Sequence, residues 1–133
     1  MSQTNAVIVP DEVVMNKIYM VRGQKVMLDR DLAKLYGVKA IRLREQVKRN
    51  KERFPKNFMM QLAEKEVEDM VSQNAIPSKQ ARGGALPYVF TEHGVLMLSN
   101  ILKSEKAIQM SIRIIEVLAT LIHLNSCNQY VMV

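Results

Sequence analysis

Long polar side chains that can hydrogen-bond to anionic and heterocyclic groups are concentrated between residues 34 and 56. This segment has nine basic and two acidic residues, a net charge of +7, whereas the whole chain of 133 residues carries +6. The basic residues are Lys34, Lys39, Arg42, Arg44, Lys48, Arg49, Lys51, Arg53 and Lys56. Arginine can bind guanine edges with two hydrogen bonds, glutamine can bind adenine, and lysine can neutralise phosphate. Such focused positive charge is typical of a surface that binds a polyanion, and a solvated helix face is the alternative.

The residues around this segment predict two helices joined by a tight turn. Asp29 is expected to cap a first helix over residues 30–36, with Gly37 just past its end in the position that tolerates a left-handed conformation. A second helix is expected from about residue 39 to 51, stopping before Pro55. The apolar residues at the expected crossing are Leu32, Ala33, Tyr36, Val38, Leu43 and Val47. This pattern predicts a helix-turn-helix.

Helical spacing separates the side chains of the second helix into two faces. If its apolar residues face inward, Arg42, Glu45 and Arg49 point outward, with Gln46 at their side. We expect Arg42, Gln46 and Arg49 to contact base edges of duplex DNA, while spaced ion pairs on a solvated face are the alternative. The residues expected at phosphates are Lys39, Arg44, Lys48, Lys51, Arg53, Lys79 and Arg82.

Alternating apolar residues predict two hairpins and a further short strand. The first hairpin spans residues 17–28 and turns at Arg22-Gly23. A strand is expected over 59–62, and a second hairpin over 72–90. The basic tip of this second hairpin, with Lys79 and Arg82, would form a DNA-contacting wing or an ordinary exposed loop.

Three further helices are expected, which completes an α+β fold in a single domain. The first is short and acidic, over 64–72; Thr91 caps the second, over 91–102, and Ser104 caps the third, over 104–124. The third is apolar over a wide arc, so we expect it to be buried or shared in a homodimer. The domain spans residues 12–124, between a flexible tail over 1–11 and a C-terminal tail over 125–133.

The same sequence argues against several other kinds of protein. Cys127 is the only cysteine, so a disulfide framework or cysteine-rich metal site is not expected. His93 and His123 lack metal-ligand spacing, and we find no catalytic constellation, so neither an enzyme nor a cofactor is expected. The chain has no secretory signal and no apolar run of membrane-spanning length, which predicts a cytoplasmic protein without membrane contact.

Four segments of the chain resemble a known family. VMLDRDLAKLYGV, KRNKERFPKNFMMQL, LPYVFTEHGVLMLSNIL and SEKAIQMSIRIIEV are similar, in this order from about Ile18 to Leu121, to the ORF-six-N domain of phage and prophage proteins, a relative of the KilA-N and Bro-N domains. The resemblance implies a DNA-binding α+β domain of the kind found at the front of antirepressor-like and regulatory proteins. Family members often continue into a coiled-coil region, so a truncated or minimal member is expected here.

The expected function is therefore transcription regulation through helix-turn-helix contact with double-stranded DNA. The alternative is a protein-interaction module that acts as an antirepressor. Such a module would bind a phage repressor, or form dimers through the helix over 104–124, without touching DNA.

Overall fold

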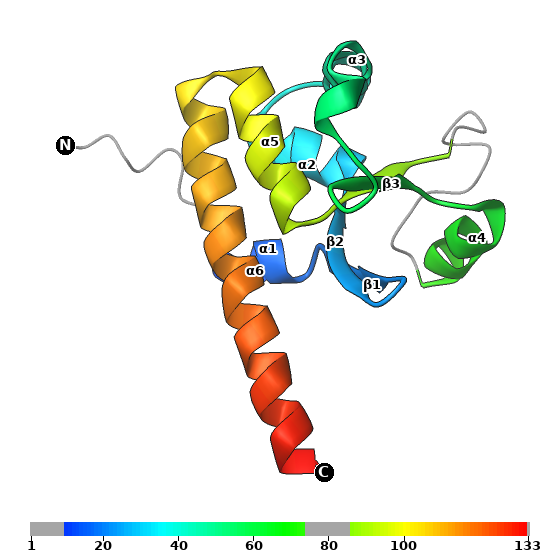
Figure 1. Ribbon diagram of the computed structural model, residues 1–133, viewed down its shortest axis with the longest axis vertical. Helices are drawn as coiled ribbons and strands as arrows, with labels where there is room; N and C mark the ends of the chain where they lie inside the picture. Colours follow the sequence, from blue (N-terminus) through cyan, green and yellow to red (C-terminus); the bar gives the residue numbers. More distant parts are fainter. Residues whose placement is uncertain (1–9, 74–85, 133) are drawn as a thin grey trace.

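The fold combines a small antiparallel sheet with helices on both of its faces (Figure 1). The computed structural model describes residues 10–73 and 86–132, with side chains as far as Thr120. In chain order the elements are α1 (Asp11–Met15), β1 (Ile18–Val21), β2 (Gln24–Leu28), α2 (Asp29–Tyr36), α3 (Ala40–Arg49), the 3₁₀ helix η2 (Lys51–Arg53), β3 (Met59–Gln61), α4 (Glu64–Ser72), β4 (Tyr88–Phe90), α5 (Glu92–Leu102) and α6 (Glu105–Met132). The predicted α+β class is thus confirmed.

The four strands form one sheet in the order β1-β2-β4-β3, with every neighbouring pair antiparallel. The first hairpin is confirmed: Arg22 and Gly23 both have positive φ, at 52° and 79°, as the tight turns that suit twisted strands require. Strand β4 lies in the middle, where Val89 is opposite Leu28 on one side and Met60 on the other. The predicted second hairpin is wrong for its described residues, because β4 pairs with β2 and β3 and Ser72 belongs to α4; residues 74–85 lie outside the described residues.

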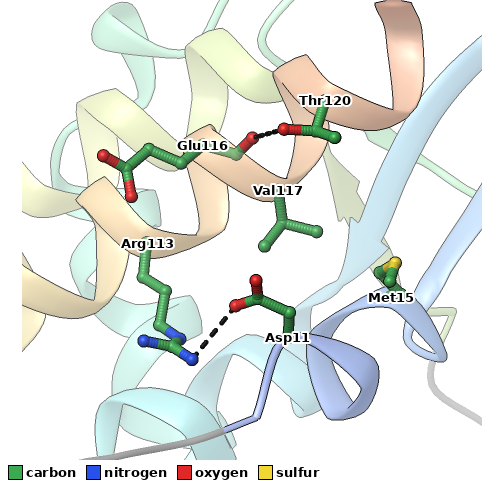
Figure 2. Close-up of a pocket in the computed structure, with 6 residues that line it drawn as sticks. All are labelled: Asp11, Met15, Arg113, Glu116, Val117 and Thr120. Carbon is green, nitrogen blue, oxygen red and sulfur yellow. Dashed lines mark hydrogen bonds and ion pairs between the residues drawn. The ribbon is translucent and has the colours of Figure 1, made fainter. Parts of the chain in front are cut away.

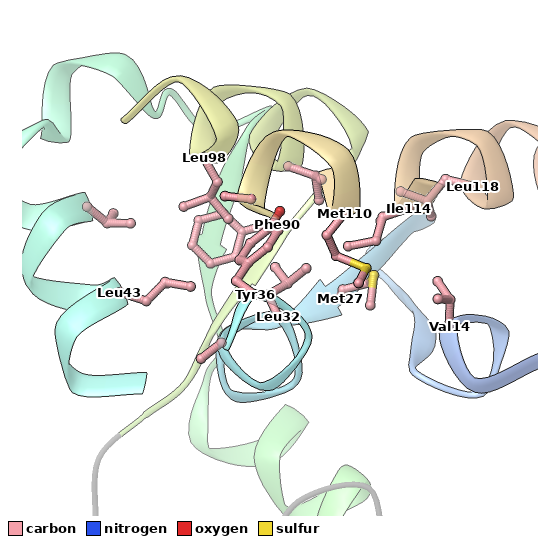
Figure 3. Close-up of a cluster of buried hydrophobic side chains, with 14 of the residues drawn as sticks. Val14, Met27, Leu32, Tyr36, Leu43, Phe90, Leu98, Met110, Ile114 and Leu118 are labelled. Atoms are coloured by element: carbon pink, nitrogen blue, oxygen red, sulfur yellow. The ribbon is translucent and has the colours of Figure 1, made fainter. Parts of the chain in front are cut away.

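Alternation along the strands sends side chains to two separate cores. Met27 and Phe90 point into the larger core, which is shared with α2, α3, α5 and α6 (Figure 3). Val26, Leu28 and Val89 point to the opposite face, where α4 covers them. Both faces of the sheet are thus buried, and α3 is held on the side of the larger core.

The helix ends mostly follow the local sequence signals. Gly37 has a φ of 74° and ends α2 in the left-handed conformation. The Thr91 Oγ1 accepts a hydrogen bond from the Gly94 N–H at the start of α5, and the Ser104 Oγ accepts one from the Ala107 N–H at the start of α6. The expected cap of α2 is wrong: the helix begins at Asp29 itself, whose carboxylate makes no capping hydrogen bond.

Helix α6 is longer than expected and runs along one side of the domain. Its backbone remains helical to Met132, so most of the predicted C-terminal tail continues the helix, which projects beyond the other elements (Figure 1). At the other end of the chain, residues 1–9 of the predicted tail lie outside the described residues, and Asp11 belongs to α1. Among the helices that the structure describes, none combines the length and apolarity needed to cross a membrane.

Candidate nucleic-acid interface

Helices α2 and α3 pack against one another across the turn at Gly37, which confirms the predicted helix pair. The Val38 N–H donates to the Ala33 carbonyl at 2.9 Å and the Gly37 N–H donates to the Lys34 carbonyl at 3.1 Å, which closes the end of α2. On the inner side Leu32, Ala33, Tyr36, Leu43 and Val47 are buried, as predicted. The packing of these residues fixes the orientation of α3 relative to the domain.

The outward face of α3 carries the side chains that the sequence singled out. Arg42, Glu45, Lys48 and Arg49 are exposed, whereas Gln46 is half-buried at the margin of the face. Within residues 10–73 and 86–120, no carboxylate lies within ion-pair distance of Arg42 or Arg49. The ion-pair alternative for this face is therefore not formed, and both guanidinium groups are available to a ligand.

Arg44 differs from the other basic residues of α3. Its Nη1 lies 3.4 Å from the Asp29 Oδ2, and its side chain is one-third exposed, on the margin opposite to Gln46. The same carboxylate oxygen accepts a hydrogen bond from the Tyr88 N–H at 3.2 Å. Arg44 thus links α3 to α2 and β4, and this geometry argues against its predicted contact with phosphate.

A second group of cations follows α3 directly. Lys51 and Arg53 lie on η2 and are exposed, as is Lys39 at the beginning of α3. Phe54 is buried, and its ring meets that of Phe90 edge-on with 5.8 Å between centroids, so the end of η2 is anchored to the larger core. The predicted wing residues, Lys79 and Arg82, lie outside the described residues.

The fold adds a cation that no local pattern indicated. A β-carbon placed on Gly37 would lie 2.7 Å from the Lys106 Nζ, so this ammonium group of α6 lies against the turn between α2 and α3. Lys106 is far from the basic segment in sequence, and only the packing of α6 brings it there. Its charge also complements the negative C-terminal end of the α2 dipole.

Two recesses on the surface are lined by side chains that do not indicate a particular ligand. One, of about 380 Å³, lies between α1 and α6, where Arg113 forms an ion pair of 3.0 Å with Asp11 (Figure 2). Another, of about 490 Å³, borders β3 and is lined by Arg22, Gln24, Lys56, Asn57, Met59, Met60 and Gln61. Neither lining contains histidine or cysteine, and in the described part of the chain no cluster of three potential metal ligands occurs.

His93, one of the two histidines considered for chemistry, has a packing role. Its ring stacks on that of Phe58 with 5.4 Å between centroids. This contact lies at the start of α5, where the Thr91 Oγ1 donates a hydrogen bond to the Asn57 carbonyl at 2.7 Å. The stacking therefore fastens α5 to the segment before β3. His123 lies in the part of α6 whose side chains are not described.

Comparison with known proteins adds one finding. No curated protein and no solved structure was found to match the chain. The family model of the ORF6N domain matches residues 16–101, nearly two thirds of the chain, from the segment before β1 to the end of α5. The matched region contains the hairpin, the helix pair, α4 and the whole of the sheet. The chain therefore belongs to the ORF6N domain family.

Proposed function

We propose that the chain binds duplex DNA by placing α3 in the major groove, and that it regulates transcription in a phage or prophage. The observation that carries the proposal is the exposure of Arg42 and Arg49 on a helix whose opposite side is buried. With ten residues, α3 is about 15 Å long, and the major groove of about 12 Å admits an α-helix. Membership of a phage-associated domain family agrees with this role.

The geometry suggests how the contacts are divided. Arg42 and Arg49 are positioned to read base edges from the outward face, and Gln46 from its margin. The proposed phosphate contacts come from both ends of α3 and from η2: Lys39, Lys48, Lys51 and Arg53, with Lys106 beside the turn. Lys79 and Arg82 stay proposed phosphate contacts from the predicted wing, whereas Arg44 is assigned to the contact with Asp29.

Fluorescence anisotropy tests this proposal directly. A preferred site is selected from a random duplex pool, and its affinity is then measured between low and moderate salt. If all seven proposed phosphate contacts are made, log K falls with log salt at a slope of about −6. The double variant Arg42→Ala/Arg49→Ala should lose at least about thirtyfold in affinity for the selected site, since each of the two base contacts is worth about 1–3 kcal/mol.

A charge-matched variant distinguishes base contacts from the non-specific electrostatic attraction between the protein and DNA. Lys25→Ala/Lys65→Ala removes the same net charge from β2 and α4, away from α3. We expect this control to bind the selected site nearly as tightly as the parent. Equal losses in the two double variants would contradict groove contact by α3, and absence of binding at about 50 mM salt would refute the proposal as a whole.

A different feature supports the protein-interaction alternative. Ile108 and Ile112 lie one turn apart on α6 and are 45% and 54% exposed, so one apolar strip of this helix has no cover within the described chain. Such a strip fits a homodimer or an antirepressor contact with a repressor protein. Sedimentation equilibrium at high micromolar concentration tests the homodimer, which Ile108→Lys/Ile112→Lys should abolish; a monomeric parent would exclude it.

A further inference from the structure

One side chain of α3 is unlike its neighbours on the outward face. Ile41 is 60% exposed, more than any other large hydrophobic residue in the described part of the chain. It lies between Ala40 and Arg42, and the other exposed residues of α3, Arg42, Glu45, Lys48 and Arg49, are all charged. Isoleucine is a weaker helix former than leucine or lysine because its branched side chain is restricted in a helix. Neither helix formation nor contact with water therefore favours isoleucine at this position.

The position of Ile41 is set by the buried residues of the same helix. Leu43 and Val47 define the inward direction, and at 100° per residue Glu45 points directly away from their midpoint. Ile41 and Arg49 lie about 40° to either side of Glu45. Ile41 is thus close to the centre of the face that is proposed to enter the groove, and it lies in the first turn of α3. In helix-turn-helix proteins the N-terminal residues of the second helix contact base edges.

The chemistry of the groove offers an apolar partner at this place. Thymine is the base that presents a C5-methyl group in the major groove, and apolar side chains recognise it by contact. The cations around Ile41 would hold phosphates on either side, so its side chain would be pressed towards the bases and not left in water. Resting on the DNA-binding role proposed above, we propose that Ile41 contacts the methyl group of a thymine and selects thymine at one position of the target.

The test removes the methyl group without changing the hydrogen bonds of the base pair. In the selected duplex, each thymine is replaced singly by deoxyuridine, and the dissociation constant is measured for the parent protein, Ile41→Ala and Met20→Ala. Met20 is the matched control, because it is 59% exposed but lies on β1. We expect the parent to bind about fourfold more weakly when the contacted methyl group is missing, because this is the affinity that the burial of one methyl group contributes.

The two variants give the decisive comparison. Ile41→Ala should bind the intact site more weakly and should no longer distinguish thymine from deoxyuridine at that position, with an unchanged salt slope. Met20→Ala should behave as the parent. Equal sensitivity in Ile41→Ala and the parent, insensitivity of the parent at every thymine, or a selected site without thymine would overturn the assignment of Ile41 while DNA binding stands. Failure of the parent to bind any duplex would instead refute the proposed function and this inference with it.

Discussion

Asp29 connects three elements through one carboxylate, and its removal offers a sharp test of how α3 is held. The side chain is 1% exposed. Its Oδ2 accepts the hydrogen bond from the Tyr88 N–H of the central strand and is paired with Arg44 of α3. In Asp29→Ala, the Tyr88 N–H loses its acceptor and Arg44 loses its counter-ion. Both losses act in the folded protein, because water satisfies both groups after unfolding.

The size of the effect follows from the two contacts. A buried N–H without an acceptor costs about 1–3 kcal/mol. The ion pair with Arg44 adds little, about 0.5 kcal/mol, because the arginine is one-third exposed and the atoms are 3.4 Å apart. We therefore expect Asp29→Ala to lower the free energy of unfolding by about 2–3 kcal/mol. Asp29→Asn keeps a carbonyl acceptor for the Tyr88 N–H and should cost only about 1 kcal/mol.

Urea unfolding followed by circular dichroism measures these differences. The control is Asp69→Ala, which removes an exposed carboxylate from α4 and should change the free energy of unfolding by less than about 0.5 kcal/mol. If Asp29→Ala and this control are equally stable, the reasoning is wrong, because the buried carboxylate would then contribute no more than an exposed one.

Two further predictions concern packing and pH. Gly94→Ala should destabilise the fold by about 3 kcal/mol in the same urea assay, because the new β-carbon would overlap the Phe58 carbonyl oxygen; a loss below about 0.5 kcal/mol would show that the backbone yields easily. Burial raises the pKa of Tyr36 to about 12 from 10.0, against the opposing hydrogen bond of 2.8 Å with Ser111. The folded pKa is the higher one, so the stability due to Tyr36 is complete below pH 10 and is lost, by roughly 3 kcal/mol in total, as the pH rises through 12. Tyr36→Phe should be about 1 kcal/mol less stable at neutral pH but should lose less stability over that range, and parallel pH profiles would contradict this.

Much of the candidate site could be predicted because its signals are local. Gly37 ends α2 since glycine adopts the left-handed conformation with little strain, and this depends on only a few residues on either side. The inward and outward faces of α3 follow from the period of the helix, so the exposure of Arg42 and Arg49 needed no knowledge of the rest of the chain. The hairpin turn and the caps at Thr91 and Ser104 are local in the same sense.

The features that were missed depend on contacts between distant segments. Aspartate is a residue type that often caps helices, but the Asp29 carboxylate instead accepts the Tyr88 N–H. Tyr88 lies beside it because β4 is inserted between β2 and β3. Arg44 carries the same charge as its neighbours, and only the fold places its guanidinium group 3.4 Å from the Asp29 carboxylate. Lys106 joins that surface because α6 packs beside α2.

The sequence by itself thus determined the type of most local elements and the polarity of their faces, because backbone conformation and helical periodicity act over a few residues. The tertiary structure decided which strand became central, which arginine pairs with Asp29 and, within the described residues, which apolar strip of α6 stays exposed. Those outcomes depend on the simultaneous burial of side chains from segments far apart in the chain, and burial is a property of the assembled fold.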